Sequence, residues 1–151
     1  MINIFKLPIL LVGIFVAIMF LLDISRIGYK VAILENVILS VVVFVLGLLI
    51  IVVGGYSFRK AKTTVNPMTP ELSTQLVTAG IYNCSRNPMY IGFLLWLLAC
   101  AIYIGNVINL LLIPLFIFLV NRLYILPEER ALEKLFKEEF RGYKKRVRRW
   151  V

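Results

Sequence analysis

Four long apolar runs, separated by short polar segments, dominate the pattern of hydrophobic and polar positions along the chain. They cover residues 4–22, 37–53, 89–104 and 107–126. Crossing a bilayer takes about 20 apolar residues at a rise of about 1.5 Å each. The pattern therefore predicts an all-α, polytopic membrane protein with about four transmembrane helices.

The ends of these runs refine the prediction. The first run is long for a signal peptide, whose apolar core has about 7–15 residues, and no small-residue cleavage site follows it. We therefore expect it to remain as a membrane helix. Only Gly105 and Asn106 separate the third and fourth runs, which predicts a tight turn and an antiparallel helical hairpin.

The segment after Pro127 predicts a further, amphipathic helix. Proline suits the first turn of a helix, Glu128 and Glu129 suit its positive end, and basic residues collect toward its negative end. Apolar residues recur at spacings of three and four, so one face either lies on the bilayer or packs back over the hairpin. That face contains Ala131, Leu132, Leu135, Phe136 and Phe140.

Composition agrees with a single membrane domain, residues 1–151. Hydrophobic residues make up 61% of the chain, whereas roughly 45–50% is typical of soluble domains. Residues 1–56 predict two scaffold helices with little polar content. Residues 57–151 hold nearly all of the polar clusters, as expected of the functional core.

The net charge of +9 predicts an orientation in the membrane. Residues 59–86 carry four basic residues against one acidic residue, and residues 127–151 carry nine against five. Basic loops stay on the cytoplasmic side, so four crossings place both termini there. A basic tail beside a bilayer attracts anionic headgroups, and we favour this interpretation over a nucleic-acid partner.

The chain has two cysteines, Cys84 and Cys100, and no histidine. The cysteines show neither metal-site spacing nor a disulfide framework, and no metal is expected. The lack of histidine excludes His-based catalytic triads and removes the commonest general base.

The most informative polar cluster is the stretch of residues 80–92, Gly-Ile-Tyr-Asn-Cys-Ser-Arg-Asn-Pro-Met-Tyr-Ile-Gly. Its first glycine permits close approach of a ligand, and Pro88 suits the first turn of a helix. Free N–H groups there, together with Arg86, can bind a carboxylate, and Tyr82 and Tyr90 can stack on an aromatic base. The alternative is an interfacial belt of Tyr and Arg side chains, and the residues alone leave both open.

The acidic pair Glu128-Glu129 follows the fourth run. Adjacent residues lie about 100° apart around a helix, so one of the two is expected to face a site and meet a cation such as an ammonium group. The alternative is simple complementarity to the helix dipole, which contributes about 0.3–1 kcal/mol and needs no function.

In this order and spacing, the motifs resemble the isoprenylcysteine carboxyl methyltransferase and phospholipid methyltransferase superfamily of integral membrane enzymes. That superfamily has Leu-Val-x-x-Gly-x-Tyr, Arg-His-Pro-x-Tyr-x-Gly, a helical hairpin, Glu-Glu and a tail with Leu-x-x-x-Phe-Gly. The resemblance covers residues 57–151, and residues 1–56 match only as hydrophobic helices. The corresponding segments are Leu76-Val77-Thr-Ala-Gly80-Ile-Tyr82, Arg86-Asn87-Pro88-Met-Tyr90-Ile-Gly92, Glu128-Glu129, and Leu132-x-x-x-Phe136 followed by Phe140 and Tyr143.

The resemblance implies S-adenosyl-L-methionine as methyl donor, bound at the cytoplasmic membrane face. It implies Glu128, Arg86 and Asn87 as catalytic residues, with Glu128 taking the donor's ammonium group. A lipophilic acceptor would arrive laterally from the bilayer. The implied cofactor-binding residues are Thr74, Gln75, Leu76, Val77, Gly80 and Tyr82 toward the adenosine, Asn87, Pro88, Met89 and Tyr90 toward the amino-acid end, and Glu128 with Glu129.

The chain departs from the superfamily pattern at three positions. Asn87 stands where the family often has histidine, so it can hydrogen-bond but cannot change charge. Lys137 replaces the usual glycine after Phe136. At the position of an arginine that engages the acceptor carboxylate in the isoprenylcysteine enzymes, this chain has Tyr124, with Arg122 two residues earlier. Both are candidate substrate residues, although two residues turn a helix by about 200°.

The leading hypothesis is therefore methyl transfer from S-adenosyl-L-methionine to a lipophilic or small acceptor, through a carboxylate, amine or thiol. One alternative is an NADPH-dependent enzyme like the membrane sterol reductases, which resemble this superfamily in their C-terminal half. Another is a non-enzymatic accessory membrane protein with a lipid- or partner-binding tail.

Overall fold

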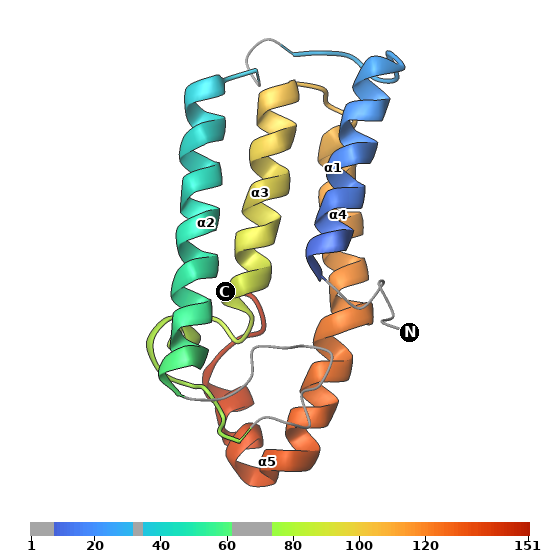
Figure 1. Cartoon of the computed structure of the whole chain (residues 1–151). Coiled ribbons are helices and arrows are strands. Elements are labelled where there is room, and N and C mark those ends of the chain that lie inside the picture. The colour runs from blue at the N-terminus through green and yellow to red at the C-terminus, as the bar shows by residue number, and fades with distance from the viewer. Residues whose placement is uncertain (1–7, 32–34, 62–73) are drawn as a thin grey trace.

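The computed structural model describes residues 8–31, 35–61 and 74–151, and every regular element in these residues is a helix. The helices α1, α2, α3 and α4 stand side by side, and α5 extends beyond one end of them (Figure 1). The all-α prediction is confirmed for the described residues, and the start of the first apolar run, residues 4–7, lies outside them. The elements are α1 (Pro8–Ile24), α2 (Val37–Lys60), the 3-10 turn η3 (Gly80–Asn83), α3 (Pro88–Ile104), α4 (Asn109–Val120), the π turn η4 (Asn121–Ile125) and α5 (Leu126–Arg146).

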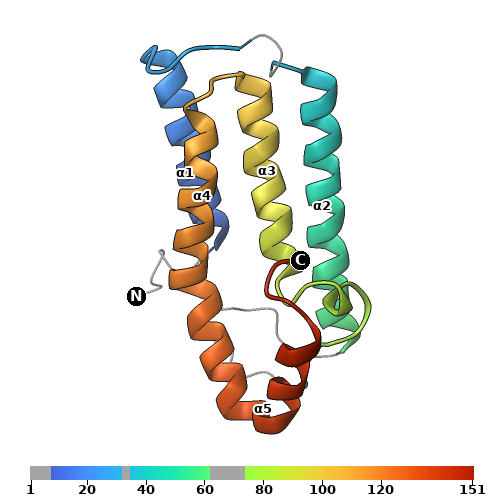
Figure 2. The same ribbon diagram turned by 180° about the vertical axis from the view of Figure 1, so that it is seen from behind.

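The central helix of the bundle is α3. It packs against α2 on one side and against α1 and α4 on the other, and the reverse view shows the same order (Figure 2). The core contains fully buried side chains from three helices, Met19, Leu97 and Phe116. Phe15 and Phe116 meet edge to face with ring centroids 5.3 Å apart, which joins α1 to α4.

Glycines bring the backbones of α2 and α3 into close contact. A Cβ atom at Gly47 would lie 2.8 Å from the carbonyl oxygen of Gly92, and a Cβ atom at Gly92 would lie 2.7 Å from the carbonyl oxygen of Gly47. Seven residues along α2, Gly54 leaves space for Met89, whose Cγ would lie 2.8 Å from a Cβ there. Small residues allow this kind of close packing in membrane helices. The contact fixes α2 against the start of α3.

Among the described residues, two helical stretches are long and apolar enough to cross a membrane: α2, and the stretch Asn109–Arg146 in which α4, η4 and α5 follow one another and which bends at Lys137. The helices α1 and α3 are also apolar but have 17 residues each. Large apolar side chains of α2 face outward, with Ile38 79% and Val52 58% exposed, whereas soluble proteins rarely expose such large apolar surfaces. The chain is therefore a membrane protein, and crossings by α1 and α3 stay a prediction.

The hairpin between α3 and α4 is confirmed, with a longer connection than two residues. Gly105 ends α3 with a φ of 70°, and α4 begins at Asn109. The side-chain amide of Asn106 donates to the carbonyl oxygen of Ile27 (2.9 Å) and accepts from the N–H of Ile108 (3.2 Å). Asn106 therefore ties this end of the hairpin to the segment that follows α1.

The predicted tail helix is present but is not straight. At η4 the N–H of Leu126 donates to the carbonyl oxygen of Asn121, five residues earlier, just before Pro127, which has no N–H to donate. Farther along, Lys137 has a φ of 41° and a ψ of −113°, and the second half of α5 returns toward the foot of α3 (Figure 2). Its apolar face packs against Leu76 in the segment before α3, so the tail folds back onto the protein.

We expect Gly92→Ala to destabilise the bundle, because the new methyl group would lie 2.5 Å from Cγ1 of Ile51 and 2.7 Å from the Gly47 carbonyl oxygen. Overpacking of this kind costs about 1–3 kcal/mol. Gly55→Ala is the matched control, since no atom lies within 4 Å of its Cβ position. Thermal unfolding in detergent should show a lower midpoint for Gly92→Ala and none of this loss for Gly55→Ala. Equal effects would contradict the close α2–α3 contact.

Candidate active site

Buried tyrosines lie near one carboxylate at the end of the bundle where α3 begins and α4 passes into α5. Glu128 lies in the first turn of α5. The hydroxyl group of Tyr90, in the first turn of α3, hydrogen-bonds to it. Tyr82 of η3 and Tyr124 of η4 are buried beside them, and the rings of Tyr90 and Tyr124 have centroids 6.2 Å apart. We call Glu128, Tyr82, Tyr90 and Tyr124 the Glu128 cluster.

The surroundings of Glu128 change its acidity. The residue keeps some exposure at its edge, but burial of the carboxyl group, followed by the charge of Glu129, raises the pKa of Glu128 to about 7. The hydrogen bond from Tyr90 acts in the opposite direction. Burial, and then the charge of Glu128, raises the pKa of Tyr82. The cluster therefore holds a carboxyl group that titrates near neutral pH beside neutral phenols.

The neighbouring carboxylate, Glu129, is held in a buried ion triad. Nη2 of Arg86 lies 2.6 Å from Oε1 of Glu129, and Nη2 of Arg149 lies 2.6 Å from Oε2. Burial alone would raise the pKa of Glu129, but the hydrogen bonds from Arg149 and Arg86 outweigh it and lower the pKa. Only one residue of the acidic pair, Glu128, therefore lies among the tyrosines, as the 100° separation predicts.

Arg86 contacts the C-terminal part of the chain as well as Glu129. Its guanidinium donates to the carbonyl oxygens of Val147 (2.7 Å) and Lys144 (3.3 Å). Its backbone N–H donates to the carbonyl oxygen of Arg148 (3.0 Å). These contacts use both Nη atoms of the guanidinium, and its Nε is buried without a partner in the described part of the chain. The geometry fits a role in positioning better than the predicted direct role in catalysis.

The start of α3 offers fewer free donors than predicted. The amide group of Asn87 donates to the carbonyl oxygen of Arg149 (3.0 Å), and its N–H donates to Oγ of Ser85 (3.1 Å). Pro88 has no N–H, and the N–H groups of the two residues after Met89 donate to the Asn87 carbonyl oxygen. Among the first four residues of α3, this leaves the N–H of Met89 as the backbone donor for which the described part of the chain shows no acceptor.

The other residues predicted near the donor are spread along the approach to α3. Thr74 and Gln75 are exposed, whereas Leu76 and Val77 are half-buried, and Leu76 packs against the returning part of α5. Gly80 turns the chain with a φ of 65°, a conformation that favours glycine. Pro88 is fully buried and Met89 fills the space beside Gly54. The structure thus brings Tyr82, Tyr90 and Glu128 together, and it places Thr74 and Gln75 at the surface.

The two predicted substrate residues face different directions. Tyr124 is 6% exposed and belongs to the Glu128 cluster. Arg122 is exposed, with its guanidinium 5.8 Å from the centre of the Phe118 ring. The structure therefore brings Tyr124 to the site and does not bring Arg122, in line with the 200° estimated from their spacing.

Sequence reasoning missed the contribution of the C-terminal residues. The hydroxyl group of Tyr143 donates to the carbonyl oxygen of Tyr82 (2.6 Å), and Arg149 holds Glu129 through two hydrogen bonds. The tail motif includes Tyr143. Nothing in the sequence distinguishes Arg149 from the basic residues around it, for which lipid headgroups are the expected partners. No group of three or more possible metal ligands occurs among residues 8–31, 35–61 and 74–151.

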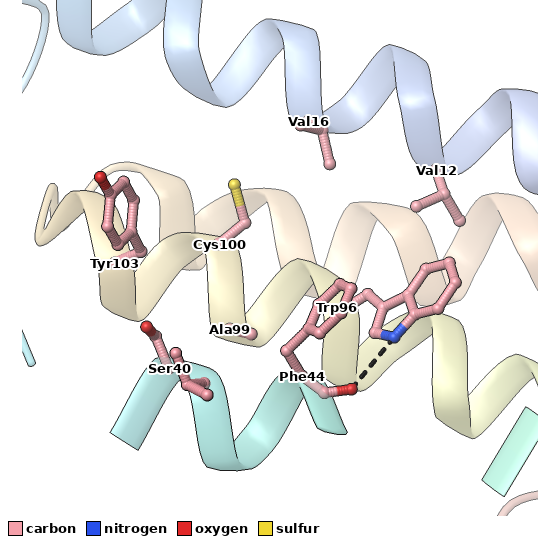
Figure 3. Close-up of a pocket in the computed structure, with 9 residues that line it drawn as sticks. Val12, Val16, Ser40, Phe44, Trp96, Ala99, Cys100 and Tyr103 are labelled. Carbon is pink, nitrogen blue, oxygen red and sulfur yellow. Dashed lines mark hydrogen bonds between the residues drawn. The ribbon is translucent and has the colours of Figure 1, made fainter. Parts of the chain in front are cut away.

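A separate apolar groove of about 330 Å³ lies between α1 and α2, over α3. In Figure 3 Val12 and Val16 point into it from α1, and Cys100 points into it from α3. Trp96 bounds the groove and donates its Nε1 hydrogen to the carbonyl oxygen of Phe44 (3.2 Å). The groove shares no lining residue with the Glu128 cluster.

The sequence profile of the phospholipid methyltransferase family matches residues 36–139, which is more than half of the chain. The chain belongs to this family. The match runs from the start of α2 into α5 and includes every residue of the Glu128 cluster. It ends before Tyr143 and Arg149, so membership of the phospholipid methyltransferase family is established without the C-terminal contacts.

Individual proteins agree with this membership. The chain is 36% identical over 72 residues to the protein-S-isoprenylcysteine O-methyltransferase of Schizosaccharomyces pombe, covering 48% of this chain and 30% of that protein. It is 30% identical over 113 residues to the Saccharomyces cerevisiae enzyme of the same name, covering 68% and 46%. An uncharacterized protein of Haemophilus influenzae is 43% identical over 63 residues, covering 42% of this chain and all of that protein.

The matches therefore span less than half the length of the two yeast methyltransferases. No solved structure matches the chain.

We expect Lys137→Gly to stabilise the protein, because the backbone at Lys137 has a φ of 41° and glycine tolerates this conformation. Relief of such strain stabilises the folded state by about 1–3 kcal/mol. Part of this gain is lost because glycine gives the unfolded chain more conformational entropy. Lys134→Gly is the matched control, since Lys134 is exposed and helical and glycine there costs about 1 kcal/mol. Thermal unfolding should move in opposite directions for the two variants, and destabilisation by both would contradict a strained turn at Lys137.

Proposed function

We propose that the chain transfers a methyl group from S-adenosyl-L-methionine to a lipophilic or small acceptor at the foot of α3. Membership of the phospholipid methyltransferase family supports methyl transfer. The Glu128 cluster supports the position of the donor, because its carboxyl group is buried and hydrogen-bonds to Tyr90, with Tyr82 and Tyr124 buried nearby. A carboxylate shielded from water in this way binds an ammonium group strongly.

When bound, the donor supplies a methyl carbon that the acceptor's lone pair attacks as the carbon–sulfur electron pair returns to sulfur. The chain's residues hold the reactants in line and exclude water. Glu128 holds the ammonium group, and the hydrogen bond from Tyr90 fixes the orientation of its carboxyl group. A carboxylate or neutral amine acceptor needs no strong base, which fits a chain without histidine.

The contacts of the other predicted residues shape this proposal. Arg86 pairs with Glu129 and the C-terminal carbonyl oxygens, so the N–H of Met89 would be the group at this helix start that is available to the donor's carboxylate. Thr74, Gln75, Leu76 and Val77 line the approach to the adenosine. Arg122 is exposed and its guanidinium lies beside the Phe118 ring, so this predicted partner of an acceptor carboxylate is not part of the Glu128 cluster. The acceptor class therefore stays open among carboxylate, amine and thiol.

A nicotinamide cofactor fits the site less well. NADPH carries several phosphate groups, which proteins bind with free cations and helix N-termini. The arginines beside the Glu128 cluster, Arg86 and Arg149, are both paired with Glu129. A purely structural accessory role would leave the enclosed carboxyl group of Glu128 without a purpose.

We infer that the site faces the cytoplasm and that all four long helices cross the membrane. The basic residues at the end of α2 and in the tail lie toward the same end of the bundle as the Glu128 cluster (Figure 1). Basic segments stay on the cytoplasmic side, and an even number of crossings returns the chain to it. Both termini would then be cytoplasmic.

The apolar groove supports a lipophilic acceptor. Trp96 lies six residues along α3 from Tyr90, a distance of about 9 Å at 1.5 Å per residue. An acceptor whose reactive end reached Tyr90 would extend its hydrocarbon chain along α3 toward Val12, Val16 and Cys100. Lateral access from the bilayer between α1 and α2 would need no polar channel.

We expect Glu128→Gln to weaken binding of S-adenosylhomocysteine about tenfold or more, because a charge-assisted hydrogen bond is worth about 1.5–3 kcal/mol. Isothermal calorimetry in detergent measures this affinity. Since the pKa of Glu128 is about 7, protonation below that pH removes the charge, and affinity should fall as the pH drops from 8 to 6. The Gln variant should lack this dependence.

Glu139→Gln, an exposed position on the same helix, is the control and should bind like the wild type. Absence of binding by folded wild-type protein would overturn the proposed function. Unchanged affinity and pH dependence in Glu128→Gln would overturn the assignment of Glu128.

Filling the groove should impair transfer to long-chain acceptors without affecting the donor. We expect Cys100→Trp to lower the rate of labelled-methyl transfer to such acceptors about tenfold and to leave the affinity for S-adenosylhomocysteine within twofold, because a bulky side chain overfills the groove. Val45→Trp, on the outward face of α2, is the control. A full rate in Cys100→Trp would exclude the groove from acceptor binding.

A further inference from the structure

The C-terminal residues 147–150, which we call the C-terminal segment, are bound along the loop that precedes α3. Oγ of Ser85 donates to the carbonyl oxygen of Arg149 (3.2 Å), and so does the side-chain amide of Asn87 (3.0 Å). The N–H and the guanidinium of Arg86 donate to the carbonyl oxygens of Arg148 and Val147. Three consecutive residues of the loop thus bind three consecutive carbonyl groups of the segment.

The same segment reaches both parts of the protein core near the site. Val147 packs with Phe140 and Tyr143 of the returning part of α5. Trp150 packs against the core cluster that includes Tyr90 and Tyr124. The C-terminal segment therefore packs against the core residues that hold Tyr90 and Tyr124 of the Glu128 cluster.

Arg149 is the side chain that joins this segment to the acidic pair. Its Nε lies 3.1 Å from Oε1 of Glu129, and its Nη2 lies 2.6 Å from Oε2. This bidentate contact fixes both position and orientation. Because Glu129 is 8% exposed, loss of one partner would leave a buried charge poorly compensated, which is strongly unfavourable.

We propose that Arg149 is a positioning residue for Glu128: by pairing with Glu129 it fixes the first turn of α5 and offsets the negative charge next to the ligand-binding carboxylate. The assignment of Glu128 as that carboxylate rests on the proposed function. Arg149 itself touches no ligand in this proposal. It acts through Glu129, with Arg86 as the second cation of the triad.

The groups near Glu128 determine how removal of Arg149 changes the titration of the Glu128 carboxyl group. The phenols of Tyr90 on α3 and Tyr82 on η3 interact with Glu128, and Tyr124 on η4 lies against the ring of Tyr90. Among the described residues, the negative charge that acts on Glu128 comes from Glu129 on its own helix. Removing Arg149 leaves the charge of Glu129 less compensated, which favours the protonated form of Glu128. Removing the charge of Glu129 leaves two arginines, which favour the ionised form. A merely structural latch would not give opposite signs for the two changes.

The test follows the titration of Glu128 itself in ligand-free protein. Carboxyl-labelled glutamate is observed by ¹³C NMR in detergent micelles, and the Glu128 signal is assigned by its loss in Glu128→Gln. We expect Arg149→Gln to raise the titration midpoint by about one pH unit and Glu129→Gln to lower it by a similar amount, because a nearby positive charge favours the ionised carboxyl group and a nearby negative charge disfavours it. Arg149→Lys keeps the charge and should stay near the wild type.

Arg148→Gln is the control, because its side chain is exposed and only its backbone contacts the loop. Unmoved midpoints in Arg149→Gln and Glu129→Gln, or shifts in the same direction, would overturn the proposal. If Arg149→Gln does not fold, Glu129→Gln must still lower the midpoint and Arg149→Lys must keep it, and any other result overturns the proposal. The NMR titration uses no ligand, so it tests the role of Arg149 alone. Calorimetry on the wild type with S-adenosylhomocysteine tests the proposed function separately.

Discussion

The buried ion triad of Arg86, Glu129 and Arg149 is the interaction on which the site end of this protein depends. A carboxylate removed from water is unstable without cations and hydrogen bonds around it. One cation comes from the loop before α3 and the other from the C-terminal segment. The loop before α3 and the C-terminal segment must therefore both contact the first turn of α5. The reversal at Lys137 is what allows the C-terminal segment to return.

This arrangement gives two adjacent acidic residues different roles. Glu129 faces the arginines and holds the backbone together, whereas Glu128 faces Tyr90 and the other phenols and keeps a carboxyl group that titrates near neutral pH. The close α2–α3 contact at Gly47 and Gly92 holds the start of α3 in place. The start of α3 and the first turn of α5 then hold the carboxyl group of Glu128 from both sides, as the proposed binding of the methyl donor for catalysis by proximity requires.

Much of the fold could be predicted from local pattern. Apolar runs and Pro88 located the long helices, Gly105 located the hairpin, and the angle between adjacent helical residues predicted that one acid of the pair would face a site. The π turn, the reversal at Lys137 and the partners of Glu129 could not be predicted. Lysine has no local preference for a positive φ, and a contact between residues far apart in the chain leaves no periodic signal. Arg149 in particular looked like any other cation of a basic tail.

Family membership establishes methyltransferase ancestry, and the geometry gives a specific account of where the donor binds. A structure determined with S-adenosylhomocysteine tests that account most directly. The account predicts the ligand's ammonium nitrogen within hydrogen-bond distance of the Glu128 carboxylate, with Glu129 still paired to Arg86 and Arg149. A ligand bound away from the tyrosines, or an ammonium group held by Glu129 after release of Arg149, would contradict it.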